Sequence, residues 1–403
     1  MRALLASVFL SLALPAHADI TLPAPISEEI GCNGLAATEA RLSGLPAPTD
    51  QDRFALGGVL FLRAVEITFQ DRYAYGMSDR TGLLPLLRLP LADNPNPKPF
   101  QPEVVVGIFT KAAAKLTEAR TELVAIPGSS DFSVQIALKD LWFDVNANGL
   151  REPGEGVAEI IGQVMVGQND QTRLWLQHLP TVRFDVADAA WLAAYADLLA
   201  GFSDMVRAYN PTEPISRALG ARAAMAALGP LSPDPIFGNA YDPDPLDVIA
   251  ILLATLNQPP KPDLMAEART HFLAMIDENR QFWPRVASET DNDNEWLPSD
   301  SQTSALGIVV PPGTGAVWMG LLGDFEGLLN GTKLAPYWRV SGRVGINVAK
   351  LFSDPRPIDL AGWIQGWGVI PYLEKGDVVS WQTIDAFNRL TTGQAPLFAI
   401  YLN

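Results

Sequence analysis

Cysteine, histidine and long apolar segments are all scarce in this chain of 403 residues. The single cysteine, Cys32, excludes an internal disulfide, so the fold has to depend on its hydrophobic core and on any bound metal. We expect Cys32 to be an unpaired small residue. Only His178 and His271 follow the first eighteen residues, too few for a transition-metal site built from several histidines. No later stretch reaches the roughly 18 uninterrupted apolar residues of a membrane-spanning helix, so no membrane span is predicted.

Basic residues are also in the minority. The chain has 29 lysines and arginines against 45 aspartates and glutamates, a formal net charge of -16. Nucleic acids and anionic membranes bind basic surfaces, so neither is expected as a partner, whereas an acidic surface suits cations or neutral ligands. The sequence also lacks the HExxH motif of zinc proteases and the GxSxG motif of serine hydrolases.

The first eighteen residues have the three parts of a secretory signal peptide. Arg2 supplies the positive charge, residues 3–14 form a short apolar run, and Ala16-His17-Ala18 provides the small residues of a cleavage site. We therefore predict cleavage after Ala18 and a periplasmic or secreted location. Cys32 lies too far downstream to carry a lipid anchor at the cleavage point.

Helical periodicity dominates the mature chain. After a loop-like lead over residues 22–52, the apolar spacing predicts helices over 54–75 and 103–124, which would form a hairpin. Alternating residues predict a strand over 131–138, and a second alternation over 181–186 is a candidate partner. Asp185 or Asp188 is expected to cap a helix that ends near Tyr209. Further helices are predicted over 157–166, 215–228, 246–256, 263–283, 316–329 and 357–373.

These patterns predict a mainly α, multi-helix globular protein with a small β element next to a calcium-binding loop. We divide the chain into the signal peptide (1–18), an N-terminal helical region with the loop (19–180) and a tryptophan-rich C-terminal helical region (181–403). No fixed-period repeat is present, so a solenoid is not supported. The repeated βαβ pattern of a periplasmic solute-binding protein is absent as well.

The most specific motif lies at residues 144–155, which read DVNANGLREPGE and match the pattern D-x-[DN]-x-[DN]-G-x5-E at every fixed position. Ca²⁺ takes six to eight hard oxygen ligands, and a tight loop with oxygens at alternate positions directs them at one centre. Gly149 permits the sharp turn. The loop therefore resembles an EF-hand calcium loop. The predicted calcium ligands are Asp144, Asn146, Asn148, the Leu150 carbonyl, Glu152 and Glu155.

The loop departs from the EF-hand pattern in three ways. Arg151 occupies a position that is usually apolar, and no second loop is present to pair with it. Pro153 and Gly154 delay the exit helix. Two ligands are neutral asparagines, which predicts a dissociation constant of roughly 10⁻⁴ to 10⁻³ M, as in extracellular modules. A solitary structural site is therefore expected rather than a switch.

Weaker signals lie elsewhere. Asp291, Asp293 and Glu295 alternate without a turn glycine, so a solvated acidic turn is favoured over a second cation site. Glu267 and His271 are one helical turn apart, and a surface pair is the simplest interpretation. Most of the ten tryptophans lie from Trp283 onward. We expect most of these to be core residues, and the alternative is a groove for sugars or peptides.

Several short strings together resemble a group of secreted bacterial proteins without an assigned activity, which also carry an Asp-rich loop. The strings are Phe54-Ala-Leu-Gly57, residues 61–66, Asp188-Ala-Ala-Trp191, residues 291–296, and Asp354-Pro-Arg-Pro357 with Asp359, Leu360 and Trp363. The resemblance spans most of the mature chain and implies no catalytic residue.

Two functional hypotheses follow. The first is a non-catalytic exported protein that is stabilised by calcium and acts through a surface for a protein or glycan partner. The second is an exported hydrolase of sugars or cell-envelope material that uses Glu289, Asp291 or Glu295 in a tryptophan-lined cleft, since glycosidases need two acids roughly 5 to 10 Å apart. Whether the protein is an enzyme is left open by the sequence.

Overall fold

The computed structural model describes residues 25–77, 84–160, 176, 178–230, 245–307 and 309–391. These residues form a mainly α-helical globular fold with two small antiparallel sheets of two strands each. The predicted fold class is therefore confirmed. Within the described ranges, no helix is both long enough and apolar enough for a membrane span.

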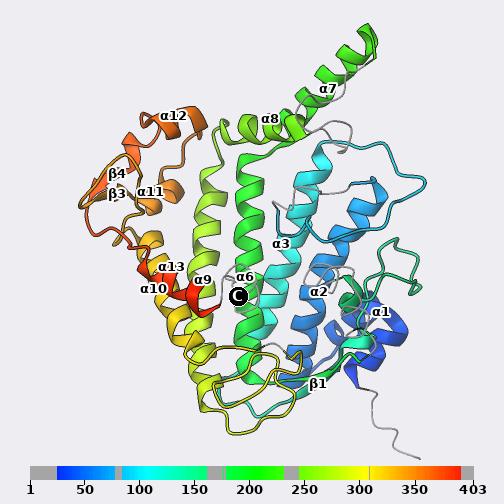
Figure 1. The fold of residues 1–403 in the computed structure, drawn as a ribbon. Helices are drawn as coiled ribbons and strands as arrows, with labels where there is room; N and C mark the ends of the chain where they lie inside the picture. The colour runs from blue at the N-terminus through cyan, green and yellow to red at the C-terminus, as the bar shows by residue number, and fades with distance from the viewer. Residues whose placement is uncertain are drawn as a thin grey trace, which may run out of the picture.

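Four long helices lie side by side in the centre of the molecule (Figure 1). They are α2 (Asp50–Ala74), α3 (Glu103–Val124), α6 (Val186–Tyr209) and α9 (Pro262–Ser288). Helix α6 packs between α3 and α9 because its buried positions are mostly small, among them Ala193, Ala194, Ala196 and Ala200. Small side chains let helix axes approach closely. The predicted hairpin is confirmed, since α2 packs against α3.

Capping residues fix where two of these helices begin. Thr49 caps α2 in a reciprocal box with Asp52, and Asp185 caps α6 in a similar box with Asp188. Each box satisfies two backbone amides that the first helical turn leaves without partners. Both aspartates proposed from the sequence therefore take part in the α6 cap.

The predicted loop-like lead is wrong, because residues Ile26–Ser43 form helix α1. The prolines that made this segment look like a loop lie at its ends, with Pro25, Pro46 and Pro48 all outside the helix. Gly34, with a φ of +77°, interrupts the helix. The Trp142 ring lies 3.1 Å from the point that a Cβ on Gly34 would occupy, and its indole N–H donates to the Ile30 carbonyl. The break thus makes room for a core tryptophan.

The small β element is confirmed. Strand β1 (Val134–Ala137) pairs antiparallel with β2 (Thr181–Phe184), with Val134 opposite Phe184. The short helix η1 (Leu138–Asp140) connects β1 to the Asp-rich loop. Of the helix predicted over 157–166, residues 157–160 are helical and the rest lie outside the described residues.

The second half of the chain adds shorter elements around α9. Helix α7 (Thr212–Leu228) projects from the body, and α8 (Pro245–Leu256) lies across its top in Figure 1. The remaining elements are α10 (Thr314–Asn330), β3 (Val344–Ile346), α11 (Val348–Ser353), α12 (Leu360–Gln365), η2 (Ile370–Tyr372), β4 (Leu373–Lys375) and α13 (Gln382–Leu390).

One predicted C-terminal helix is wrong. The pattern over 357–373 indicated a single helix, yet α12 ends at Gln365 and the chain continues as η2 and then β4, which pairs with β3. Gly366 has a φ of +126°, a conformation that other residues rarely adopt, and it ends the helix. The proposed boundary between the two regions at residue 180 stays a prediction. Helix α6 begins just after it and packs both against α3, from the first region, and against α9, from the second.

Candidate cation sites

The Asp-rich loop is closed at its base by backbone pairing. The Phe143 amide donates to the Glu155 carbonyl at 2.9 Å, and the Val157 amide donates to the Leu141 carbonyl at 3.0 Å. The side chains of Trp142 and Phe143 at this base are buried in hydrophobic core. The two ends of the loop are therefore fixed next to each other, while its tip reaches solvent.

Side-chain oxygens at alternate positions shape the loop. The carboxylate of Asp144 accepts from the amides of Asn148 and Gly149, both at 2.9 Å, and the Asn148 side chain accepts from the Leu150 amide at 2.7 Å. Gly149 has the positive φ (+75°) that the motif requires. These bonds are local turn interactions, which aspartate and asparagine side chains commonly make.

Three of the predicted ligands converge on one side of the loop. The side-chain amides of Asn146 and Asn148 donate to the two carboxylate oxygens of Glu152 at 2.9 and 3.0 Å. The side-chain oxygens of Asn146 and Asn148 accept from the backbone amides of Asn148 (3.0 Å) and Leu150 (2.7 Å), so these oxygens, with their second lone pairs, are the atoms that a cation would use. The Leu150 side chain is exposed, as expected for a residue that contributes only its carbonyl.

The side chain of Glu155, the last residue of the loop, bonds back to the loop's own backbone. Its side chain is buried, and its two oxygens accept from the amides of Val145 (3.0 Å) and Glu152 (2.7 Å). Burial raises the pKa of Glu155, the two amides oppose this, and the negative charges of Asp144 and Glu152 raise it further. A bound cation would remove this repulsion, so the carboxylates of the loop favour positive charge at its centre.

Arg151 connects the loop to the segment before it. Its guanidinium donates to the Lys139 carbonyl at 2.9 Å, which ties the loop to the η1 segment. A paired EF-hand would use this position for an apolar contact with a second loop. The structure replaces that contact with a bond inside the chain.

A second acidic group forms where α9 ends. Carboxylate oxygens of Glu289, Asp291 and Glu295 all lie within 4.8 Å of one another. Asp293, which the sequence pattern included, instead donates its amide to Glu295. Among the described residues, the acids of the 144–155 loop do not form a group of three this close together.

The second group lies against the start of α6. Burial, opposed by the bond from Gln302, raises the pKa of Glu289 to about 7, and the charges of Asp185, Glu295 and Asp291 raise it further. Asp188, also buried, has its pKa raised well above its ordinary value by burial and by the neighbouring acids. The neighbouring cation is Arg183, which pairs with Asp185 at 3.2 Å and with Asp291 at 3.0 Å.

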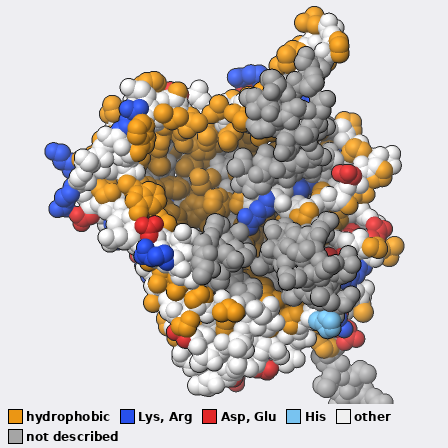
Figure 2. Space-filling model, in the orientation of Figure 1, with side chains coloured by type: hydrophobic (Ala, Val, Ile, Leu, Met, Phe, Trp, Pro, Cys, Tyr) orange, Lys and Arg blue, Asp and Glu red, His pale blue; other side chains and the backbone are white. Residues whose placement is uncertain are grey.

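A cavity also lies near the end of α9. A cavity of about 590 Å³ opens beside the end of α9 and the start of α10, and it is lined by Trp283, Val286, Ser299, Gly315, Met319 and neighbouring residues. In the described part of the chain, none of the three acids lines it. A separate hollow with hydrophobic walls is visible on the face shown in Figure 2. The acidic group is therefore not part of the cavity beside α9, and the hydrolase function stays a hypothesis.

The C-terminal tryptophans are not all core residues. Trp318 is buried, but Trp338, Trp367 and Trp381 are exposed. The expectation of core packing is thus wrong for these three. Cys32 is exposed and free, as expected.

One polar network was misread in the sequence. His271 does not form a simple surface pair with Glu267: its Nδ1 bonds to Asp197 at 2.7 Å, and its Nε2 lies 3.7 Å from Asp204. Arg120 of α3 donates to the other oxygen of Asp197 at 2.6 Å. The network therefore joins α3, α6 and α9. Its members are far apart in sequence, so no local spacing indicated it.

Comparison with protein-family models, with curated proteins and with solved structures finds no match to this chain. Functional inference therefore rests on the sites themselves.

Proposed function

We propose that this is an exported calcium-binding helical protein in which a single Ca²⁺, held by the 144–155 loop, stabilises the fold. The observation that carries the proposal is the twelve-residue pattern itself, matched at every fixed position and folded with Gly149 at a positive φ and Glu155 turned back beneath the loop. Those are the features that the loop needs to surround a cation.

The proposed ligands are the side chains of Asp144, Asn146, Asn148 and Glu155, together with the Leu150 carbonyl. Glu152 contributes directly or through a water. Oxygen donors of this kind suit a hard cation such as Ca²⁺ better than a transition metal, which prefers nitrogen and sulfur ligands. Export through the predicted signal peptide would bring the loop to a compartment where millimolar-range affinity suffices for occupancy.

The proposal predicts that calcium raises the melting temperature of the mature chain (19–403) relative to chelator. At a calcium concentration one hundred times the dissociation constant, binding stabilises the fold by about 2.7 kcal/mol. The double variant Asp144→Ala with Glu155→Ala should lose this increase. A matched double variant, Asp93→Ala with Asp131→Ala, removes two exposed acids outside the loop and should retain it. Identical melting of the wild type in calcium and in chelator would contradict the proposal.

Hydrolysis of sugars or cell-envelope material stays the alternative hypothesis. It is supported by the pKa of Glu289, which lies near 7 and would let this residue act as an acid at neutral pH. We favour the non-catalytic function because the described cavity does not contain the acidic group.

A further inference from the structure

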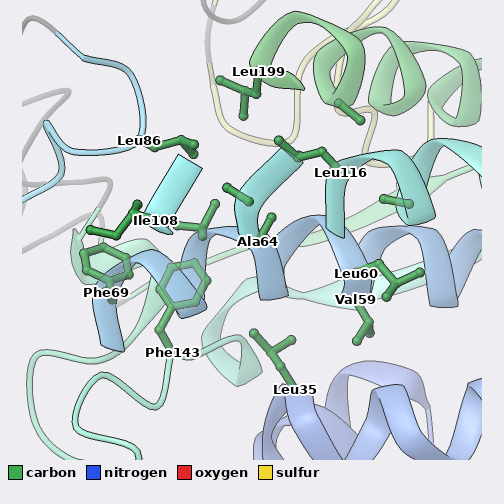
Figure 3. Packing of buried hydrophobic residues seen from close by; sticks show 14 of the residues in the cluster. Leu35, Val59, Leu60, Ala64, Phe69, Leu86, Ile108, Leu116, Phe143 and Leu199 are labelled. Atoms are coloured by element: carbon green, nitrogen blue, oxygen red, sulfur yellow. The ribbon is translucent and has the colours of Figure 1, made fainter. Parts of the chain in front are cut away.

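The proposed calcium loop packs against helix α2, which lies outside the motif. Figure 3 shows Phe69 of α2 beside Phe143, the residue that precedes the loop, and their ring centroids are 5.2 Å apart. Both rings are buried. This contact places the next residue of α2, Gln70, beside the next residue of the chain, Asp144.

Gln70 holds a single peptide group of the loop. Its Nε2 donates to the Asp144 carbonyl at 2.8 Å. The amide on the other side of that same peptide bond belongs to Val145, and it donates to Glu155 Oε1 at 3.0 Å. Because a peptide group is planar, fixing its carbonyl also fixes its N–H. Gln70 therefore orients the amide that positions the closing glutamate of the loop.

Glu66 lies one helical turn before Gln70 and is 1% exposed. Its Oε1 is paired with Arg63, but its buried Oε2 has no hydrogen-bond partner among the described residues. Gln70 links Glu66 to the loop, because its Nε2 lies 3.4 Å from Glu66 Oε1 and donates to the Asp144 carbonyl. A buried acid with an unpaired oxygen costs free energy unless positive charge is nearby. Arg63 supplies one positive charge to Glu66, and a cation in the loop would supply another.

We propose that Gln70 and Glu66 form a second layer of the calcium site, in which Gln70 is a positioning residue and Glu66 adds negative charge behind Asp144. This inference rests on the proposed calcium function and extends it, because it assigns part of the affinity to a helix outside the loop. Groups that orient metal ligands from behind typically change metal affinity ten- to a hundredfold. Calcium binding is thereby coupled to α2 and to the core that α2 shares with α3.

The test compares calcium dissociation constants by isothermal titration at pH 8. Gln70→Met keeps the length of the side chain and removes the donor, and it should weaken calcium binding at least tenfold. The matched control Gln101→Met changes an exposed glutamine away from the loop and should bind calcium as the wild type does. A merely structural role for Gln70 would lower the melting temperature in chelator and leave the dissociation constant unchanged, which would overturn the inference.

Glu66→Gln keeps the inference testable if Gln70→Met does not fold. This change preserves the shape of the side chain and removes its charge, so it should weaken calcium binding. It also breaks the ion pair with Arg63, so some loss of stability in chelator is expected and the dissociation constant is the deciding measurement. Unchanged or tighter binding would overturn the role assigned to Glu66. If the wild type binds calcium and these variants bind equally well, the second layer is refuted and the proposed function stands. If the wild type binds no calcium, the proposed function itself fails.

Discussion

The close contact between α6 and α9 predicts that adding one methyl group at Gly201 lowers the stability of the fold. Gly201 lies on the buried face of α6, and a Cβ there would meet ring atoms of Phe272 at 2.7, 3.0 and 3.0 Å. Phe272 cannot easily retreat, because it is buried and packs against Phe202, Phe325 and Phe352. Gly201→Ala should therefore force the two helices apart or push the ring out of its preferred rotamer.

Two opposing effects determine how much Gly201→Ala changes the free energy of unfolding. Replacing glycine with alanine inside a helix stabilises it by about 0.8–1.0 kcal/mol, whereas overpacking a core typically costs about 1–3 kcal/mol. Gly107→Ala in α3 is the matched control, because nothing lies within 4 Å of its added Cβ. The difference between the two variants isolates the steric cost, so Gly201→Ala should be about 1–3 kcal/mol less stable than Gly107→Ala. Guanidinium unfolding of both variants measures this, and equal stabilisation by both would refute the reasoning.

Two further predictions concern buried charge. Asp197→Ala removes the carboxylate between Arg120 and His271, so it should lower the free energy of unfolding by on the order of 3 kcal/mol, measured as a lower denaturant midpoint. An unchanged midpoint would mean that the network does not stabilise the helices. Glu289 has a folded-state pKa of about 7, above its unfolded value, so its contribution to stability is present below about pH 4.3 and is lost as the pH rises through about 7. Because the residue is half-exposed, the loss should be at most about 1 kcal/mol, and thermal melts in chelator between pH 4 and 8 should show a flatter profile for Glu289→Gln; parallel profiles would contradict this assignment.

The long helices could be predicted from sequence because each carries its own signal. The range 103–124 was identified to the residue, since apolar positions recur at helical spacing and Pro102 precedes the first turn. Helix α1 was missed because its periodicity is interrupted at Gly34, and the interruption is stabilised by Trp142, a residue more than a hundred positions away. A tertiary contact of that kind leaves no local pattern in the sequence.

In the candidate sites, too, local patterns could be recognised from the sequence and tertiary contacts could not. The 144–155 loop was recognisable because its proposed ligands lie within twelve consecutive residues, so chain spacing alone specifies their order. Gln70 carries no such signal, and neither does the bond between Asp197 and His271. Both depend on which helix faces which, and that is settled by packing of side chains distant in the chain.

The two acidic segments, which look alike in sequence, differ in what surrounds them. At 144–155 the carboxylate of Asp144 accepts from backbone amides of the loop. The neighbouring helix adds a further acid, Glu66, whose Oε1 pairs with Arg63 and whose Oε2 has no hydrogen-bond partner among the described residues. At 289–295 an arginine from β2 already lies among the acids and pairs with Asp291. A cation bound at the second group would have to share its ligands with Arg183, whereas one bound in the loop would add to the positive charge that Arg63 already supplies to Glu66. This difference, rather than the number of acids, favours the loop as the calcium site.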